Sequence, residues 1–327
     1  GYCKNLIPKT THLHDLLVDI DIHSCYGNGL LNQSYPIGRP CFLSYRKCDA
    51  KSKLTLKQFL SSKIKKDLVP GLWYARISST KPLSFYQDLF LSKIPPNNNN
   101  LKPLNIDDHY AQQSQDILGE FILLTHEIHH AALTHDLLQI ARSVMSNKEW
   151  SEFSNNVVVD ALIYYPKTLQ VETIDQLIEE DLKAGGIEKR INRSYGEVIE
   201  DLRSHHWLSI PMGNNWIDKL LGMRKNYAKD HPLNNIYKAI INSTYGVIAS
   251  SYFNISNVVV ANNITARSRG LAWMMAKALG VKQIITDGGV FQVNSVNSWF
   301  NKQPSMNTMS LIGSPDELHS QSSRHLR

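Results

Sequence analysis

The sequence predicts an α+β protein with antiparallel strand pairing, and two local patterns indicate this class. Near the end of the chain, the β-type runs 282–286 and 290–293 flank Asp-Gly-Gly, which is a typical β-hairpin signal. Before them, helical segments over 215–229 and 234–249 are separated by only four residues. A connector this short requires the two helices to run antiparallel, as an αα-hairpin.

Composition limits the possible classes of protein. The chain has 327 residues, enough for about two domains or one large unit, with 42% hydrophobic residues, an ordinary globular balance. Its formal net charge of +6 is compatible with a polyanionic partner such as nucleic acid. No apolar run approaches the roughly 20 residues of a membrane-spanning helix, so we expect no membrane protein.

The four cysteines all fall within the first 48 residues, at positions 3, 25, 41 and 48. Their spacings fit no zinc-binding pattern, because the close pairs of such sites are missing. We therefore expect reduced thiols in an intracellular protein.

The first element is a strand over 16–22, whose second half alternates apolar and acidic residues. This period places Asp19 and Asp21 on the same face. A turn-forming cluster at 24–29 ends the strand.

Further elements follow from periodicity and from turn residues. We predict a basic helix over 54–67, a strand over 72–77 after a Pro-Gly break, an Asn-rich surface loop at 97–100, a strand over 121–125, a helix over 134–153, a buried strand over 157–165, an acidic amphipathic helix over 173–184 and a helix over 265–279. Residues 303–327 are polar and Ser-rich, which predicts a tail.

Two acidic residues lie at places where phosphoryl-transfer enzymes hold divalent ions. Asp21 ends a strand, and Asp287 lies in the turn of a hairpin. Hard cations require oxygen ligands, and a two-metal site needs them on rigid strand ends. Taken singly, the alternative is strong for each residue, because Asp before Gly is a common turn residue and Asp at a strand end is commonly just solvated.

A helix face carries the second candidate group. Lys238, Asn242 and Tyr245 are spaced i, i+4 and i+7, so they share one face of their helix. An ammonium, an amide and a phenol on one face suit a triphosphate and a base, although an ordinary solvated face is the alternative. Arg224 and Lys225, on the antiparallel helix, can bring further positive charge.

The run from His126 to His130 satisfies H-E-x-x-H, the zinc-hydrolase motif. The pattern is short and arises by chance, and a helix start with exposed histidines is the alternative. Metal analysis separates the two, since a zinc hydrolase should purify with zinc.

Three segments, in this order, resemble the motifs of family B DNA polymerases, and most closely the organellar, plasmid and viral branch. Residues 21–26 resemble motif A, Asp-x-x-Ser-Leu-Tyr-Pro, with Cys25 for Leu and Gly27 for Pro. Residues 238–246 match motif B, Lys-x-x-x-Asn-Ser-x-Tyr-Gly, at every defined position, and the segment 258–267 is similar to the one that follows motif B. Thr-Asp at 286–287 resembles the second half of motif C, Tyr-x-Asp-Thr-Asp-Ser.

The resemblance implies a polymerase palm with an antiparallel sheet and an αα-hairpin fingers subdomain. It also implies addition of dNTPs to the 3′-hydroxyl of a primer–template DNA. Asp21 and Asp287 would hold two Mg²⁺ ions, or Mn²⁺, with the Ile22 carbonyl as an additional ligand. Tyr26 would be the gate that excludes a 2′-hydroxyl.

The resemblance also implies the residues of the nucleotide site. Lys238 would contact the triphosphate, helped by Arg224 or Lys225, and Asn242 would line the nucleotide pocket. Tyr245 and Gly246 would pack near the nascent base pair.

The chain departs from the family pattern in three ways. Ile285 stands where the first motif C aspartate belongs, and Gly288 stands where its serine belongs. Too few residues precede Asp21 for an exonuclease domain, and too few follow Asp287 for a full thumb. Another chain could supply both.

We expect the N-terminal part of the palm, with an insertion, over 1–165 and the fingers over 166–250. The C-terminal part of the palm would occupy 251–300, with a tail over 301–327. Abundant Asn, Ile and Lys favour a mitochondrion or another DNA-containing organelle, with a bacterial or plasmid-bearing cytoplasm as the alternative.

A second functional hypothesis remains open at this point. A catalytically decayed polymerase domain could serve as a nucleic-acid-binding or structural subunit of a larger assembly. Ile285 and the missing domains favour this interpretation, whereas the intact Asp21, Lys238 and Asp287 favour catalysis.

Overall fold

Antiparallel strands and the helices packed on them make up the structure, a computed structural model. It describes residues 3–5, 17–45, 53–90, 92–94, 122–184, 188–193, 196–201, 203–279, 283–285 and 287–292. The mixed architecture, with mostly antiparallel sheets, is compatible with the predicted α+β class. The predicted Asn-rich loop and the C-terminal tail lie outside the described residues.

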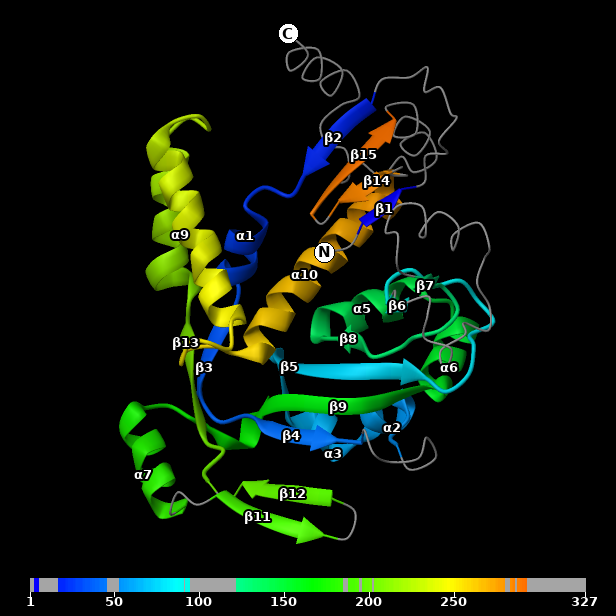
Figure 1. Cartoon of the computed structure of the whole chain (residues 1–327), viewed down its shortest axis with the longest axis vertical. Helices are drawn as coiled ribbons and strands as arrows, with labels where there is room; N and C mark the ends of the chain where they lie inside the picture. The colour runs from blue at the N-terminus through cyan, green and yellow to red at the C-terminus, as the bar shows by residue number, and fades with distance from the viewer. Residues whose placement is uncertain are drawn as a thin grey trace.

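One sheet joins the two ends of the sequence (Figure 1). Its strands, in spatial order, are β1 (Cys3–Asn5), β14 (Gln283–Ile285), β15 (Gly288–Gln292) and β2 (Leu17–Asp21). The predicted hairpin near the C-terminus is confirmed, as β14 and β15 pair antiparallel. Because β15 also pairs with β2, Gly288 lies opposite Asp21.

A second four-stranded sheet holds the largest core. Its order is β4 (Cys41–Ser44), β9 (Val157–Pro166), β5 (Leu68–Ser79) and β8 (Ala131–Leu133). The predicted buried strand at 157–165 is confirmed as β9. The predicted break before Leu72 is wrong, because β5 continues through it with an irregular register and with Gly71 at φ +77°.

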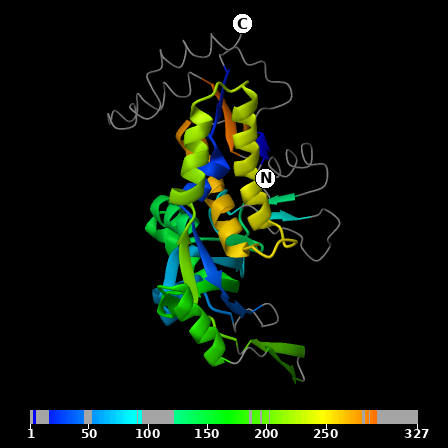
Figure 2. The ribbon, with the colours of Figure 1, turned by 90° about the vertical axis from the view of Figure 1, so that its left-hand side faces the viewer.

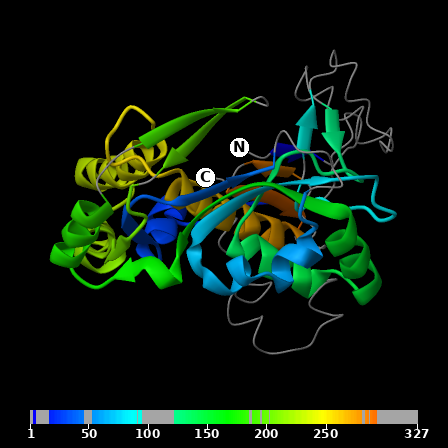
Figure 3. The same ribbon diagram turned by 90° about the horizontal axis from the view of Figure 1, so that it is seen from below.

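Four helices surround this sheet: α2 (Leu56–Ser61), α3 (Lys63–Asp67), α5 (His135–Val144) and α6 (Asn147–Asn156). Seen from below, α2 and α3 lie under the strands (Figure 3). The helices predicted over 54–67 and 134–153 are each two helices, because a serine inside each range caps a new helix. Ser146 forms a capping box with Glu149 at the start of α6, and Ser62 caps α3.

The remaining described strands form three smaller sheets. They are β10 (Gln170–Val171) with β13 (Trp207–Pro211) and β3 (Ser34–Gly38); β6 (Ser92–Ile94) with β7 (Ile122–Leu124); and β11 (Glu188–Arg193) with β12 (Gly196–Asp201). Two helical elements follow β9, the 3₁₀ turn η2 (Lys167–Leu169) and the predicted acidic helix, α7 (Ile174–Ala184).

The predicted αα-hairpin is confirmed (Figure 2). A π-helical turn, η3 (Gly213–Ile217), leads into α8 (Asp218–Lys225), and α9 (Pro232–Ala249) packs beside α8. The last helix among the described residues, α10 (Val258–Leu279), begins seven residues before its predicted start at 265. The Asn257 side chain explains the earlier start, because it accepts hydrogen bonds from the backbone N–H groups of Val259 and Val260.

The predicted turn at 24–29 is wrong, because most of it is helix α1 (Cys25–Leu31). Its glycines lie where three helices approach. A Cβ on Gly27 would lie 3.1 Å from Leu221 of α8 and 3.2 Å from Ile241 of α9, and one on Gly29 would lie 3.0 Å from Ile264 of α10. The glycines therefore let α1 fit among these helices, at the end of β2.

The H-E-x-x-H segment is not a helix, contrary to the helix start predicted there. Residues 126–130 form bends and irregular structure before β8. His126 contacts Thr125 at 3.0 Å, and His130 Nδ1 lies 2.9 Å from an Asp160 oxygen. Among the described residues, no group of three or more His, Cys, Asp or Glu could hold a metal. The geometry of a zinc hydrolase is therefore not present here.

The part of the chain that the structure describes contains no helix that is long and apolar enough to cross a bilayer.

Asp160 is a buried polar residue of β9 in the large sheet, with only 2% of its surface exposed. Its carboxylate binds Lys53 at 2.7 Å as well as Ser78 and His130. Burial acts to raise the pKa of Asp160, but the hydrogen bonds from Lys53 and Ser78 outweigh it and hold the pKa below its usual value.

We expect Asp160→Asn to lower the free energy of unfolding at pH 7 by ~3 kcal/mol, because Lys53 loses its buried partner. A lowered pKa stabilises the fold at neutral pH, and this stabilisation is lost as the pH falls through the folded-state value. Urea unfolding should therefore show a steeper loss of stability below about pH 4 in the unmodified chain than in the variant. The exposed Asp175→Asn is the control. If the unmodified chain, Asp160→Asn and Asp175→Asn had equal free energies of unfolding, the stabilising role of the Asp160 carboxylate would be contradicted.

Candidate active site

A polar cavity of about 300 Å³ lies where the end of β2, the start of α1, the turn before β15 and the α8–α9 hairpin meet. The residues that line it come from opposite ends of the chain. They are Asp21, Ile22, His23, Ser24, Cys25, Tyr26, Arg224, Lys229, Asn234, Asn235, Lys238, Ile241, Asn242 and Asp287.

Two carboxylates form one wall of the cavity. Asp21 ends β2, and Asp287 immediately precedes β15, so the β2–β15 pairing places them next to each other. The backbone N–H of Ile22 donates to the Asp287 carbonyl at 3.0 Å and closes this corner. A Cβ on Gly288 would lie 3.2 Å from Asp21 Oδ1, so the glycine leaves room for that carboxylate.

The electrostatic environment opposes two negative charges here. The pKa of Asp21 is raised, first by burial and then by the charges of Asp287 and Asp19, while Lys238 acts to lower it. The two carboxylates supply hard oxygen donors, and Ile22 lines the cavity beside them. This combination of hard donors and mutual repulsion fits Mg²⁺ or Mn²⁺.

Cationic side chains from the helical hairpin also line the cavity. Lys238 of α9 is close enough to Asp21 to influence its pKa, and Lys229 enters from the α8–α9 connector. Two hydrogen bonds hold the Arg224 side chain of α8 in place. Its Nη1 donates to Ser24 Oγ, and its Nε donates to Asn234 Oδ1 at 3.1 Å. The guanidinium therefore ties the hairpin to the start of α1.

Asn234 fixes the hairpin from the other side. Its amide donates to the backbone carbonyls of Arg224, at 3.2 Å, and of Tyr227, at 2.9 Å. The Arg224 carbonyl also accepts from the backbone N–H of Tyr227 at 3.3 Å, so the Asn234 side chain adds a second bond at the end of α8. The spacing between α8 and the Lys238 face of α9 is thereby set by side-chain hydrogen bonds as well as by packing.

An aromatic pair borders the cavity. The rings of Tyr26 and Tyr245 are stacked, with centroids 4.3 Å apart and an interplanar angle of 16°. Tyr26 is 37% exposed, so one face of the pair remains open. Burial, then the charge of Asp287, raises the pKa of Tyr26, so its phenol keeps its proton near neutral pH.

Most site residues predicted from sequence come together here. Asp21, Ile22, Tyr26, Arg224, Lys238, Asn242 and Asp287 line the cavity, and Tyr245 reaches it through its stack with Tyr26. Lys225 and Gly246 are exposed and lie outside the lining.

Sequence reasoning missed several residues that line the cavity: His23, Ser24, Cys25, Lys229, Asn234, Asn235 and Ile241. A signal existed for Asn234 and Asn235. They precede Lys238 by four and three residues, a spacing that places them near its face of the helix.

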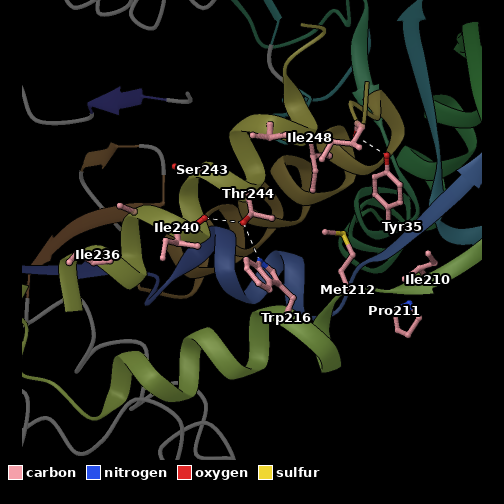
Figure 4. Close-up of a pocket in the computed structure, with 13 residues that line it drawn as sticks. Tyr35, Ile210, Pro211, Met212, Trp216, Ile236, Ile240, Ser243, Thr244 and Ile248 are labelled. Carbon is pink, nitrogen blue, oxygen red and sulfur yellow. Dashed lines mark hydrogen bonds between the residues drawn. The ribbon is translucent and has the colours of Figure 1, made fainter. Parts of the chain in front are cut away.

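The other side of α9 borders a larger hollow of about 770 Å³ (Figure 4). Its lining is almost wholly apolar, and Ile236, Ile240 and Ile248 come from α9 itself. Trp216 Nε1 contacts Thr244 Oγ1 at 3.4 Å, and no charged residue lines this hollow. Despite its size, it offers nothing for phosphate chemistry, so the smaller polar cavity is the candidate active site.

We expect Asp21→Asn to raise the melting temperature at pH 7 without divalent cations, because it removes repulsion with Asp287. A carboxyl group whose pKa is raised by folding stabilises the fold at pH values below its unfolded-state pKa. This stabilisation is lost as the pH rises through the folded-state pKa. The advantage of the variant should therefore shrink as the pH falls toward 4. Differential scanning calorimetry from pH 4 to 8 measures this. Exposed Asp218→Asn is the control, and a lower melting temperature for Asp21→Asn at pH 7 would contradict the repulsion.

Comparisons with known proteins add three findings. No family model matches the chain. A curated relative, the uncharacterized mitochondrial protein ymf29 of Marchantia polymorpha, is 41% identical over 127 residues, which cover 35% of this chain and 60% of the relative. The solved structure of Phi29 DNA polymerase with primer–template DNA and incoming nucleotide substrates aligns with a TM-score of 0.41 and 12% identity. That alignment covers 85% of this chain and 40% of the polymerase chain.

Proposed function

We propose that the chain carries the palm and fingers of a template-directed DNA polymerase, which adds dNTPs to a primer 3′-hydroxyl. One observation carries the proposal: segments around residues 21–26, 238–242 and 287 converge on a single polar cavity. Its lining combines carboxylates with cationic side chains, the two kinds of charge that nucleotidyl transfer requires.

The carboxylate wall would hold two Mg²⁺ ions, or Mn²⁺, through Asp21, Asp287 and the Ile22 carbonyl. When bound, these ions neutralise phosphate charge and favour ionisation of the attacking hydroxyl. The chain supplies the placement, because the β2–β15 pairing fixes both acidic residues at one edge of the sheet. Fixed oxygens avoid reorganisation during the reaction, and positioning provides most of the catalysis in phosphoryl transfer.

The helical wall would bind the nucleotide. Lys238 lines the cavity, acts electrostatically on Asp21 and would hold the triphosphate, helped by Lys229. Arg224 would act through its bonds to Ser24 and Asn234, which hold the hairpin at the correct distance. Asn242, one turn beyond Lys238, would contact the nucleotide within the pocket.

The relative from Marchantia polymorpha is described as mitochondrial. We therefore extend the proposal to a mitochondrial location, in agreement with the compositional expectation. Primer–template DNA and dNTPs would be the partners.

A catalytically decayed polymerase domain that binds nucleic acid within a larger assembly is the second candidate. One observation favours it, since Ile285, and not an aspartate, ends β14 directly before the Asp287 turn. The cavity then retains two carboxylates where the family pattern has three. Binding of DNA or RNA without nucleotide addition would follow.

Primer extension with Mg²⁺ or Mn²⁺ tests the proposal. We expect extension by the unmodified chain and a loss of at least about 100-fold in Asp21→Ala and in Asp287→Ala, since each removes a ligand at the reacting centre. Lys238→Ala should mainly raise KM for dNTP, because it removes a triphosphate contact. Lys148→Ala, an exposed lysine of α6 outside the cavity, is the control.

No extension by the unmodified chain, even with candidate partner chains added, would refute the proposal. Retained salt-sensitive binding of DNA or RNA would then support the second candidate.

The sugar gate gives a separate prediction. Tyr26 is partly exposed beside Asp287 and stacked on Tyr245, so its ring can lie under the sugar of a bound nucleotide. Tyr26→Ala should raise incorporation of rNTPs relative to dNTPs by about tenfold or more, because a steric clash with the 2′-hydroxyl disappears. Single-nucleotide extension with each substrate measures the ratio, with Tyr26→Phe as the control. An unchanged ratio in Tyr26→Ala would exclude the gate.

A further inference from the structure

Three large apolar side chains form an exposed stripe along α7. Ile174, Ile178 and Leu182 are spaced i, i+4 and i+8, so they share one face of the helix. Each is more than half exposed, and Leu182 reaches 77%, whereas Leu177 on a neighbouring face is buried. At 1.5 Å per residue the stripe is about 12 Å long. We call it the α7 ridge, and its spacing is typical of a helix face that packs against another surface.

The large hollow beside α9 is an apolar groove of matching chemistry (Figure 4). Ile236 and Ile248 mark its length along α9, about 18 Å at 1.5 Å per residue, so the groove is longer than the ridge. Ile236 and Trp216 are half exposed, which shows that the groove is open to solvent. The small Ala239 and Ser243 also line it and leave room for the side chains of an incoming helix. An apolar helix face in an apolar groove is a recurring mode of protein recognition.

Charge distinguishes among the classes of partner that could cover the ridge. Four of the 11 residues of α7 are acidic and one is basic, so the helix carries a formal charge of −3. Nucleic acid and anionic membrane surfaces are therefore unfavourable partners. The whole chain carries +6, which leaves +9 on the part outside α7. An acidic helix is thus attracted to a second copy of this basic chain.

The rim of the groove carries charge of the required sign. Lys219 is exposed on α8 and follows Trp216 by three residues, about one helical turn, so it lies beside the groove. On α7, Asp175 is exposed and follows Ile174, at the border of the ridge. Apolar contacts in the centre and opposite charges at the edge are the usual arrangement of a specific protein interface.

The ridge and the groove belong to elements on the same side of the molecule. Figure 2 shows α7 and the α8–α9 hairpin together on the side that faces the viewer, which is the left-hand side of Figure 1. A two-fold axis on this side would bring the α7 of each copy to the hairpin of the other. Both helix–groove contacts then form at once, which doubles the apolar surface that one contact would bury.

We propose that two copies of the chain form a two-fold dimer in which each α7 ridge occupies the apolar groove of the other copy. The interface goes beyond the proposed function, because the groove lies on the side of α9 away from the polar cavity. Leu182 and Trp216 supply apolar contacts, and the acidic border of α7 meets Lys219.

Sedimentation equilibrium of the full chain, from low to high micromolar concentration, tests the proposal. We expect the unmodified chain to dimerise as the concentration rises. Leu182→Asp destroys the ridge and Ile236→Asp destroys the groove, so each should weaken dimerisation at least about tenfold. An equimolar mixture of the two variants should associate more tightly than either variant alone, because one ridge and one groove remain intact.

Val144→Asp is the matched control. Val144 is an exposed apolar residue of α5, away from both the ridge and the groove, so its replacement should leave dimerisation unchanged. Circular dichroism checks the fold of every variant. If Ile236→Asp does not fold, Trp216→Ser provides the groove variant.

Three results would overturn the proposal. The first is an unmodified chain that stays monomeric over the whole concentration range, which would leave the ridge to a different protein. The second is dimerisation that neither Leu182→Asp nor the groove variant weakens. The third is a mixture of the two variants that associates no better than each variant alone, since the ridge would then not bind the groove.

Discussion

The packing of α1 against three helices is the constraint on which the rest of the site depends. Gly27 and Gly29 have no side chains, so α1 can touch Leu221, Ile241 and Ile264 at distances that a Cβ would make too short. The start of α1 is also the end of β2, apart from a short turn. Close packing of this one helix therefore places the strand that carries Asp21 beneath the lysine face of α9.

Around that contact, the acidic and the basic residues of the site come from different kinds of secondary structure. Strands contribute the acidic groups, which the sheet holds at fixed spacing, and helices contribute the basic groups. Arg224 joins the two sets, because it binds both Ser24 beside α1 and Asn234 on α9. The hydrogen bonds of Arg224 therefore hold the site together from within its lining. They join the start of α1 to the α8–α9 hairpin through side chains as well as through the backbone.

Periodicity and turn chemistry predicted the elements whose signals are local. The β14–β15 hairpin, the buried strand β9 and the α8–α9 pair follow directly from alternation, composition and connector length. The wrong predictions have a physical cause in tertiary contacts, which a short stretch of sequence does not show. Gly27 and Gly29 look like turn residues in sequence, and only their tertiary neighbours show that they permit helix packing.

The same reasoning explains what could be predicted of the cavity. Residue type and helical spacing brought Asp21, Asp287, Lys238 and Asn242 forward as candidates, because each has recognisable chemistry at a recognisable place. Ser24 matched the motif A serine, but its bond to Arg224 could not be predicted, because Arg224 is remote in sequence.

The pairing of β2 with β15 has a consequence for how the protein forms during synthesis. Asp287 follows Asp21 by 266 residues, the difference between their positions in the chain. At a translation rate of about 5–20 residues per second, β2 leaves the ribosome roughly 13–50 seconds before its partner strand exists. Until then its edge has no β15 to pair with, and long-range pairings of this kind form slowly. Nascent β1 and β2 therefore both await partner strands from the far end of the sequence, and the acidic edge is among the last parts of the molecule to assemble.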